Sequence, residues 1–276
     1  MARRRRGRAR KSRIGGIIAV ILIVLFGLYR SGAFAGVLNR VGLTSSITAQ
    51  TTGTNAVDQK AYKQLAQLTF SSGGKPVIQV NHGQSTLTAS TWKNSHIDYG
   101  NLDRLNRTTT NTAYLNKTNL GKSAGRPSQE WTPTGWHYNR SGQTEIYNRG
   151  HLIAYTLTFN INADGHYEQG AEGSSDNPKN LATQSAYANQ VLMQIYEGKV
   201  RQALEDGQQV IYQVTTVFRG DELMPRGYWA QALSTDGSLN FNVYIFNVQP
   251  GYQFNYTDGS VQADAAMKVD ESGLDN

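Results

Sequence analysis

The stretch "EIYNRGHLIAYTLTF" at 145–159 places a cation and an imidazole almost side by side within a run of apolar residues. His151 titrates near neutral pH, so its neutral form can take a proton from a water molecule. Arg149 stands two residues earlier in an extended segment, so it projects to the same side as His151 and can contact a phosphate. The alternative interpretation is structural: an arginine in a loop, Gly150 in a turn and a core histidine with satisfied hydrogen bonds.

The elements around this tripeptide must position its side chains. The apolar residues on either side indicate a half-buried strand within 146–155. A long loop follows at 160–179, and "NLATQ" at 180–184 fits either a short strand or the first turn of a helix. The only long helical pattern comes next, with Ser185 suited to its N-cap and Gly207 to its C-terminal stop.

This order of elements, with these residues, resembles the DNA/RNA non-specific endonucleases, a branch of the ββα-metal (His-Me finger) nucleases. It is most similar to the membrane-anchored DNA-entry nucleases of streptococci. The family motif Asp-Arg-Gly-His corresponds to 148–151, the asparagine of the following helix to Asn189, and a glutamate further along that helix to Glu197. "WTPTGW" at 131–136 is similar to the segment that leads into the finger, and the resemblance covers residues 75–255.

The resemblance implies an α+β fold, with a mixed or antiparallel central sheet and a ββα-metal finger. It implies a metal-dependent, sequence-non-specific endonuclease that hydrolyses extracellular DNA, with RNA as a further substrate. His151 is then the general base, Arg149 and Glu197 are further catalytic residues, and Asn189 is the metal ligand. One amide oxygen plus waters suits Mg²⁺, for which Mn²⁺ can substitute. Eight residues of helix rise by roughly 12 Å, so we expect Glu197 to hold a water near the metal without sharing direct ligation with Asn189. The alternative for Glu197 is an ordinary carboxylate on the helix surface.

Asn148 departs from the family pattern, which has an aspartate there. Asparagine keeps the shape and one acceptor oxygen but lacks the negative charge. We therefore expect Asn148 to belong to the catalytic group of an active or weakened enzyme. The alternative is an inactive nucleic-acid-binding surface protein. A cell-wall module whose Tyr-rich strands bind sugars is a third interpretation, and it leaves the spacing of His151, Asn189 and Glu197 to chance.

The charge of the chain is distributed unevenly. Residues 1–13 contain eight Lys and Arg and no acid, whereas the chain beyond Ala35 has 18 basic and 20 acidic residues. The overall charge of +7 is therefore no argument for nucleic-acid binding by the folded body. Within that body, Arg104–Arg149 holds seven basic residues against two acids, which fits a polyanion footprint. We expect Arg126 and Arg140 to contact substrate. Asn180, on the second finger strand, is expected to bind substrate or orient the site, with strand-end hydrogen bonding as the structural alternative.

The N-terminal segments predict export. The basic segment 1–13 precedes sixteen uncharged residues at 14–29, which the positive-inside rule orients with the basic end in the cytoplasm. We interpret 14–35 as a signal anchor, which places the catalytic domain outside the membrane of a Gram-positive bacterium. A signal peptide cleaved near Ala35, which would release the protein, is the alternative. A linker follows at 36–55.

The remainder is expected to form a nuclease domain at 56–258 and a flexible acidic tail at 259–276. The predicted elements outside the finger are one docking helix and four strands, at 56–70, 75–81, 209–218, 228–234 and 239–249. The last two strands are joined through "TDGS", a good hairpin turn. The chain has no cysteine, which excludes disulfide scaffolds, thiol nucleophiles and cysteine-zinc sites. The predicted partners are DNA or RNA and the membrane, with no obligate protein partner.

Overall fold

The structure is a computed structural model that describes residues 56–138 and 145–274. The basic segment, the signal anchor or signal peptide and the linker predicted at 1–55 lie outside the described residues. Within the described ranges, no helix has the length and apolar character needed to cross a membrane.

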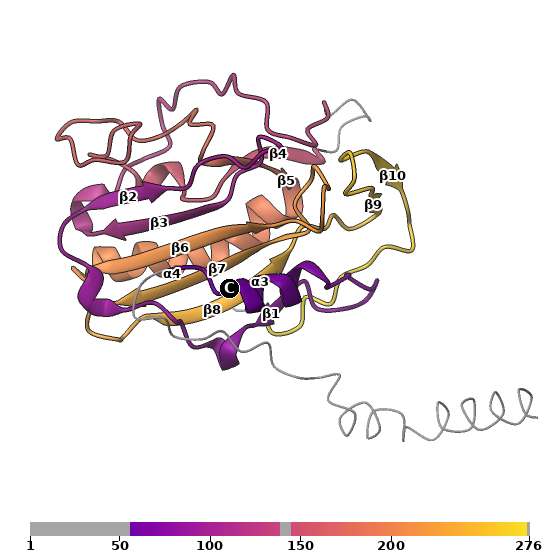
Figure 1. The fold of residues 1–276 in the computed structure, drawn as a ribbon, viewed down its shortest axis with the longest axis horizontal. Helices are drawn as coiled ribbons and strands as arrows, with labels where there is room; N and C mark the ends of the chain where they lie inside the picture. The colour runs from indigo at the N-terminus through magenta and orange to yellow at the C-terminus, as the bar shows by residue number, and fades with distance from the viewer. Residues whose placement is uncertain (1–55, 139–144, 275–276) are drawn as a thin grey trace, which may run out of the picture. The chain divides into compact units, whose positions relative to one another are not determined.

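The centre of the described fold is a six-stranded antiparallel sheet with the strand order β1-β8-β7-β6-β3-β2 (Figure 1). Its strands are β1 (Val77–Gln79), β2 (His96–Tyr99), β3 (Thr110–Leu115), β6 (Val210–Val217), β7 (Gly227–Ser234) and β8 (Asn240–Phe246). The four strands predicted outside the finger correspond to β1, β6, β7 and β8, and the β7–β8 hairpin turns through 235–238 as predicted. The α+β fold and the antiparallel form of the sheet are therefore confirmed.

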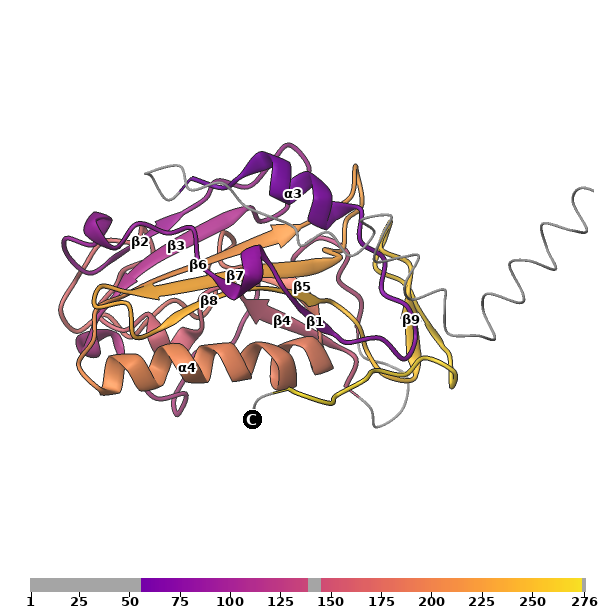
Figure 2. The ribbon, with the colours of Figure 1, turned by 90° about the horizontal axis from the view of Figure 1, so that it is seen from below.

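Helices cover the two faces of this sheet (Figure 2). On one face lies a continuous helical run formed by η5 (Ala188–Met193), which is π-helical, and α4 (Gln194–Glu205). Leu192, Val200 and Leu204 of this run share a core cluster with alternate residues of β6, β7 and β8. On the other face, Leu65 of the shorter helix α3 (Gln59–Ala66) belongs to a second core cluster that also contains Trp229. This alternation follows from the period of two in the strands, because neighbouring residues face opposite sides.

Both predicted ends of the long helix are confirmed. The Ser185 hydroxyl accepts a hydrogen bond from the backbone N–H of Ala188 at 2.9 Å, as an N-cap does. At the other end Gly207 adopts φ +87°, and the N–H of Gln208 donates to the Ala203 carbonyl at 3.0 Å, which ends the helix. The start of this helix is thereby fixed directly after the finger strands.

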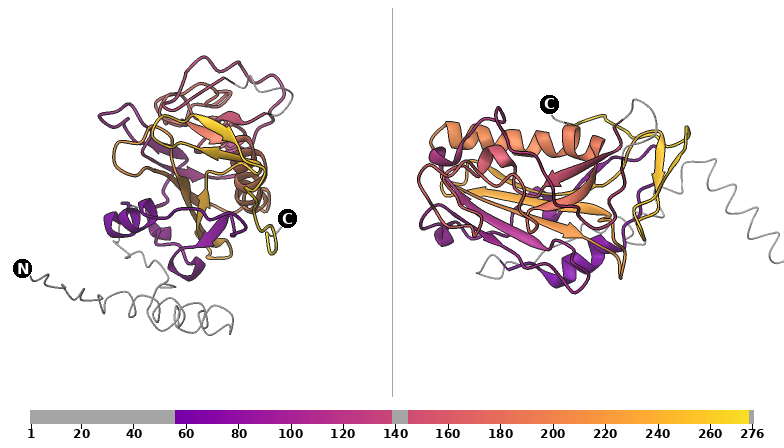
Figure 3. Two further views of the ribbon diagram at one scale, coloured as in Figure 1. Left: turned by 90° about the vertical axis from the view of Figure 1, so that its right-hand side faces the viewer. Right: turned by 90° about the horizontal axis from the view of Figure 1, so that it is seen from above.

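The remaining elements are short. In the part of the chain that the structure describes, four 3₁₀ helices lie in the connections: η1 (Asn81–Gly83), η2 (Ala89–Thr91), η3 (Lys117–Asn119) and η4 (Tyr155–Leu157). A two-stranded sheet of β9 (Tyr252–Phe254) and β10 (Val261–Ala263) lies beside the end of the main sheet (Figures 1 and 3). The finger itself is a second two-stranded sheet, β4 (Tyr147–His151) and β5 (Leu181–Ser185).

The C-terminal residues are packed against the domain, in contrast to the flexible tail expected from residue 259. The backbone N–H of Gly73 donates to the Lys268 carbonyl at 2.9 Å, and that of Asp270 donates to the Gly74 carbonyl at 2.9 Å. Val269 also packs against the core. The acidic composition gives no sign of this packing, because it depends on four scattered apolar residues and on hydrogen bonds to distant parts of the chain.

Candidate active site

The finger consists of β4 and β5 paired antiparallel, with Asn148 opposite Gln184 and His151 opposite Leu181. The helical run begins immediately after β5, so the order is strand, strand, helix. The extended segment predicted over 146–155 ends as a strand at His151, because the Asn180 side chain takes over the backbone hydrogen bonds of Ile153. Of the two predictions for residues 180–184, the short strand is confirmed.

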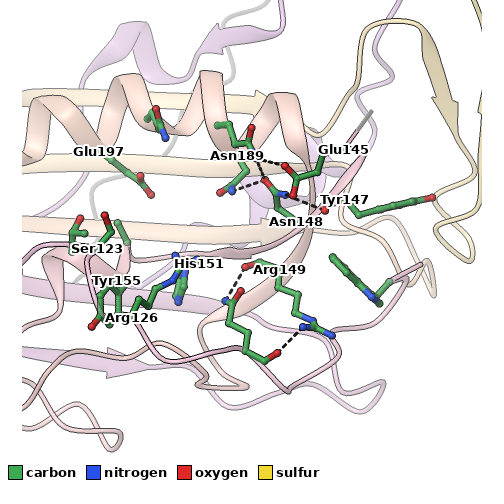
Figure 4. Close-up of a pocket in the computed structure, with 16 residues that line it drawn as sticks. Ser123, Arg126, Glu145, Tyr147, Asn148, Arg149, His151, Tyr155, Asn189 and Glu197 are labelled. Atoms are coloured by element: carbon green, nitrogen blue, oxygen red, sulfur yellow. Dashed lines mark hydrogen bonds between the residues drawn. The ribbon is translucent and has the colours of Figure 1, made fainter. Parts of the chain in front are cut away.

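A polar cavity of about 610 Å³ lies between the finger and the helix (Figure 4). Six of the residues predicted for the site line it together: Arg126, Asn148, Arg149, His151, Asn189 and Glu197. Tyr155 and Arg126 line the cavity on the side of His151 that faces away from Arg149. The structure thus brings together side chains from three separate segments.

His151 is 8% exposed, and its Nε2 lies 2.9 Å from the carbonyl oxygen of Ser175. A carbonyl oxygen can only accept, so Nε2 carries the proton of the neutral ring and Nδ1 keeps a lone pair. Burial lowers the pKa of His151 to about 4, with Arg126 adding to the effect and the Ser175 carbonyl opposing it. The ring is therefore neutral at physiological pH and has one nitrogen available as a base.

Asn189 is held by the finger. Its Nδ2 donates to the Oδ1 of Asn148 at 2.9 Å, while its own Oδ1 has no hydrogen-bond partner among the described residues. A hard, neutral oxygen in a polar cavity is a donor that Mg²⁺ accepts alongside waters. No group of three or more His, Cys, Asp and Glu that could hold a metal occurs in the described ranges. The residues present therefore fit a cation held by one amide oxygen and water.

Glu197 lines the same cavity as Asn189 although eight residues separate them. In a regular α-helix such residues would lie about 80° apart around the axis. The π-helical turns of η5 rotate less per residue, which brings Glu197 closer to the face of Asn189. Burial raises the pKa of Glu197 to about 7, with Arg201 opposing. A carboxylate without a hydrogen-bond partner in the described structure, facing Asn189, adds negative charge where a cation would be held.

Arg149 lies in the cavity wall. Its Nη1 donates to the Gln129 carbonyl at 2.6 Å, its guanidinium carbon is 5.0 Å from the ring centre of Trp136, and its buried Nε has no partner among the described residues. The Nε2 of Gln129 in turn donates to the carbonyl of Ser175 at 3.3 Å, the same oxygen that accepts the hydrogen bond from His151 Nε2. Gln129 therefore connects the Arg149 guanidinium to the His151 ring through hydrogen bonds.

The three predicted substrate-binding residues differ in position. Arg126 is exposed at the edge of the cavity, 6.0 Å from the Tyr155 ring centre. Arg140 lies outside the described residues. Asn180 is fully buried and does not line the cavity; its side chain bonds both backbone groups of Ile153 and accepts from Asn111. Asn180 thus braces the end of β4.

Sequence reasoning missed Gln129, Ser175 and Glu145. Ser175 acts through its backbone carbonyl, which no residue type reveals. Glu145 accepts hydrogen bonds from both Asn148 and Gln190, at 2.7 and 2.8 Å. The sequence did contain a signal for Glu145: it stands three residues before Asn148, which occupies the position where the family has an aspartate.

The comparisons with known proteins agree with this geometry. The family model described as DNA/RNA non-specific endonuclease matches residues 84–235, more than half of the chain. A deoxyribonuclease from Streptococcus dysgalactiae subsp. equisimilis is 25% identical over 256 residues, covering 81% of this chain and 74% of that protein.

Two solved structures share the fold. The magnesium-bound crystal structure of NucA from Streptococcus agalactiae is 26% identical, has a TM-score of 0.61, and covers 77% of this chain and 100% of its own. The zinc-bound structure of the nuclease Sda1 is 21% identical, has a TM-score of 0.53, and covers 69% and 97%. The chain belongs to the DNA/RNA non-specific endonuclease family and is a hydrolase.

Proposed function

We propose that the chain hydrolyses phosphodiester bonds of extracellular DNA, and of RNA as a further substrate, without sequence preference and with a divalent cation. The observation that carries the proposal is one cavity lined by a neutral imidazole, an amide oxygen without a partner in the described structure and a half-buried carboxylate: His151, Asn189 and Glu197. This set matches the needs of phosphodiester hydrolysis, which are a base, a cation site and an anionic group that orients water.

In this mechanism the Nδ1 of His151 takes the proton of the attacking water, and the Ser175 carbonyl holds the ring as the imidazolium forms. Arg149 and Arg126 lie on the cavity wall and rim, where they can contact the phosphate oxygens. Such contacts carry no base information, which supports cleavage without sequence preference.

Asn189 would hold the cation through Oδ1, with Glu197 nearby to orient water. When bound, the cation would stabilise the negative charge that develops on the phosphate. Mg²⁺ is the cation that the donor set favours, with Mn²⁺ as a substitute. The bound magnesium in the S. agalactiae relative supports this choice.

The Asn148 replacement is compatible with an active enzyme. Its Oδ1 accepts the hydrogen bond from Asn189, as one oxygen of an aspartate would. The interpretation as an inactive binding protein requires that the lost charge be indispensable at this position. The arrangement of His151 and Asn189 instead supports an active or weakened nuclease.

We further propose that the N-terminal segment anchors the protein in the membrane with the nuclease domain outside, where DNA uptake, nutrient scavenging and clearance of extracellular DNA are the roles that fit this placement. This proposal rests on the basic segment followed by sixteen uncharged residues. Release after cleavage near Ala35 would give the same activity in solution. Fractionation of cells into membrane and medium distinguishes the two.

The test is cleavage of supercoiled plasmid by the purified protein across Mg²⁺ concentrations. We expect EDTA to abolish cleavage, and His151→Ala to reduce its rate about 10²–10⁴-fold because the base is lost. His166→Ala is the matched control, since His166 is exposed and lies outside the cavity. A wild-type protein that binds DNA in a salt-sensitive way but leaves plasmid intact would instead support the inactive binding protein.

A further inference from the structure

Four side chains at the start of β4 and of the helix form a closed hydrogen-bond network (Figure 4). Asn148 Nδ2 donates to one carboxylate oxygen of Glu145 at 2.7 Å. The Nε2 of Gln190 donates to the other carboxylate oxygen at 2.8 Å and to Asn148 Oδ1 at 3.0 Å. Asn189 Nδ2 donates to the same Asn148 Oδ1 at 2.9 Å. The network therefore runs from an exposed glutamate to the amide that lines the cavity.

The orientation of both amides follows from the groups that accept from Asn148, of which Glu145 makes the shorter hydrogen bond and the Tyr147 carbonyl the longer one, at 3.0 Å. Carboxylate and carbonyl oxygens only accept hydrogen bonds, so the NH₂ end of the Asn148 amide faces them and its oxygen is left for Asn189. That oxygen in turn requires the NH₂ end of Asn189, which leaves the Oδ1 of Asn189 for the cavity. If Asn148 rotated by 180°, Asn189 would have to rotate too and would present a hydrogen-bond donor, which cannot bind a cation.

We propose that Glu145 is a positioning residue for metal binding, which fixes the Asn148 amide and through it keeps the Asn189 oxygen facing the cation site. The proposal rests on the proposed function, because it assumes that Asn189 holds a cation. It extends that function by assigning a role to a residue outside the family motif. It also explains how an asparagine serves at a position where the family has aspartate.

The two residues form a matched pair. An aspartate at 148 would need no orienting partner, because both of its oxygens accept. Yet its second oxygen would then face the Glu145 carboxylate, where the structure has a donor and an acceptor 2.7 Å apart. Two carboxylates at that separation repel each other. Asn148 is therefore matched to Glu145, and Asn148→Asp should be tolerated better in this chain when residue 145 is uncharged.

The experiment measures Mn²⁺ binding to the metal-free full chain by isothermal titration calorimetry, with wild type, Glu145→Ala, Asn148→Asp and the double variant. Losing a residue that orients a metal ligand typically costs about 10–100-fold in affinity, and we expect about tenfold for Glu145→Ala because Glu145 is exposed. The double variant is expected to bind Mn²⁺ within about threefold of wild type, because the two changes are coupled. Asn148→Asp alone should bind no more tightly than the double variant.

Two further variants separate orientation from charge. Glu145→Gln keeps an acceptor oxygen for Asn148 and should retain most of the Mn²⁺ affinity. Glu205→Ala removes an exposed carboxylate from the end of α4 and should bind like wild type. The thermal melting temperature of each metal-free variant shows whether it is folded. Should Glu145→Ala not fold, the Glu145→Gln and double variants still test the proposal.

Three results would overturn the proposal. In the first, Glu145→Ala binds Mn²⁺ as tightly as wild type. In the second, Glu145→Gln loses as much Mn²⁺ affinity as Glu145→Ala, and in the third, Glu145→Ala lowers the affinity equally whether residue 148 is Asn or Asp. The last two would mean that charge or folding matters and the amide orientation does not. Failure of the proposed function looks different. In that case the wild type itself binds no Mn²⁺ and leaves plasmid intact.

Discussion

The side chain of Gln184 lies against Gly150 across the finger, so closely that a Cβ on residue 150 would come within 1.6 Å of the Gln184 Oε1. Gln184 is fully buried, and neither its oxygen nor its nitrogen has a hydrogen-bond partner in the described structure. The glycine between Arg149 and His151 is therefore required by packing. Because Gly150 has no side chain, Gln184 can pack against its backbone, and β4 can hold His151 in position.

We predict that Gly150→Ala destabilises the protein by about 1–3 kcal/mol, because the added methyl group must displace a buried side chain. The double variant Gly150→Ala, Gln184→Ala should recover most of this loss, since the shortened side chain makes room. Urea unfolding followed by circular dichroism measures both. Equal stability of the single variant and wild type would show that Gln184 moves aside at no cost.

Asn180 should matter for stability as well as for activity. We expect Asn180→Ala to cost about 2–4 kcal/mol, because it removes the side-chain partner of the buried N–H and carbonyl of Ile153 and one of the two acceptors of the Asn111 amide. Plasmid cleavage should fall too, since the end of β4 positions His151.

The control for this variant is Asn101→Ala, an exposed asparagine whose loss should change stability by less than about 0.5 kcal/mol. Both variants are compared by their urea midpoints and by cleavage rates. A stable Asn180→Ala protein that loses cleavage would contradict the bracing role and return Asn180 to the substrate-binding role expected from sequence.

The parts of the fold that are local in sequence could be predicted. Alternating apolar residues indicated β6, β7 and β8, and the caps Ser185 and Gly207 marked the ends of the helix. These features depend on residues a few positions apart, so their pattern is visible in a single sequence.

The remaining features depend on contacts between distant segments. The π-helical turns of η5 change the hydrogen-bond register without changing the apolar pattern, so the cavity face that Glu197 and Asn189 share is not visible in the sequence. The proton position on His151 depends on a carbonyl 24 residues away. The network around Asn148 forms only because the start of β4 meets the start of the helix.

Arg126 gives a prediction about salt. The side chain is exposed at the cavity edge, where it can neutralise one phosphate. We expect Arg126→Ala to weaken DNA binding in EDTA and to reduce the slope of log K against log salt concentration by about 0.9, because one fewer counterion is released. Lys60→Ala, an exposed lysine of α3 outside the cavity, is the control. Identical slopes for Arg126→Ala and wild type, measured by fluorescence anisotropy, would remove Arg126 from the footprint.

The final prediction concerns two opposed effects of pH on the metal-free protein. The pKa of His151 falls to about 4 in the folded state, so its contribution to stability is present above its ordinary value of 6.5 and is lost as pH falls towards 4. The pKa of Glu197 rises to about 7, so its contribution is present below its ordinary value of 4.5 and is lost as pH rises through 7. Between about pH 4.5 and 6.5 the two contributions change in opposite directions and largely cancel.

Replacing one of the two residues should reveal the pH dependence that the other contributes to stability. In EDTA, the stability of Glu197→Gln relative to wild type should rise by roughly 2–3 kcal/mol from pH 4.5 to pH 7.5, because the variant no longer buries a charge. His151→Ala should show the opposite trend and fall relative to wild type from pH 4 to pH 6.5. Urea unfolding at a series of pH values measures both differences, and differences that do not change with pH would contradict the burial of the two groups. Added Mg²⁺ should reduce the gain of Glu197→Gln at high pH, because a cation near Asn189 offsets the charge that burial otherwise disfavours in the wild type.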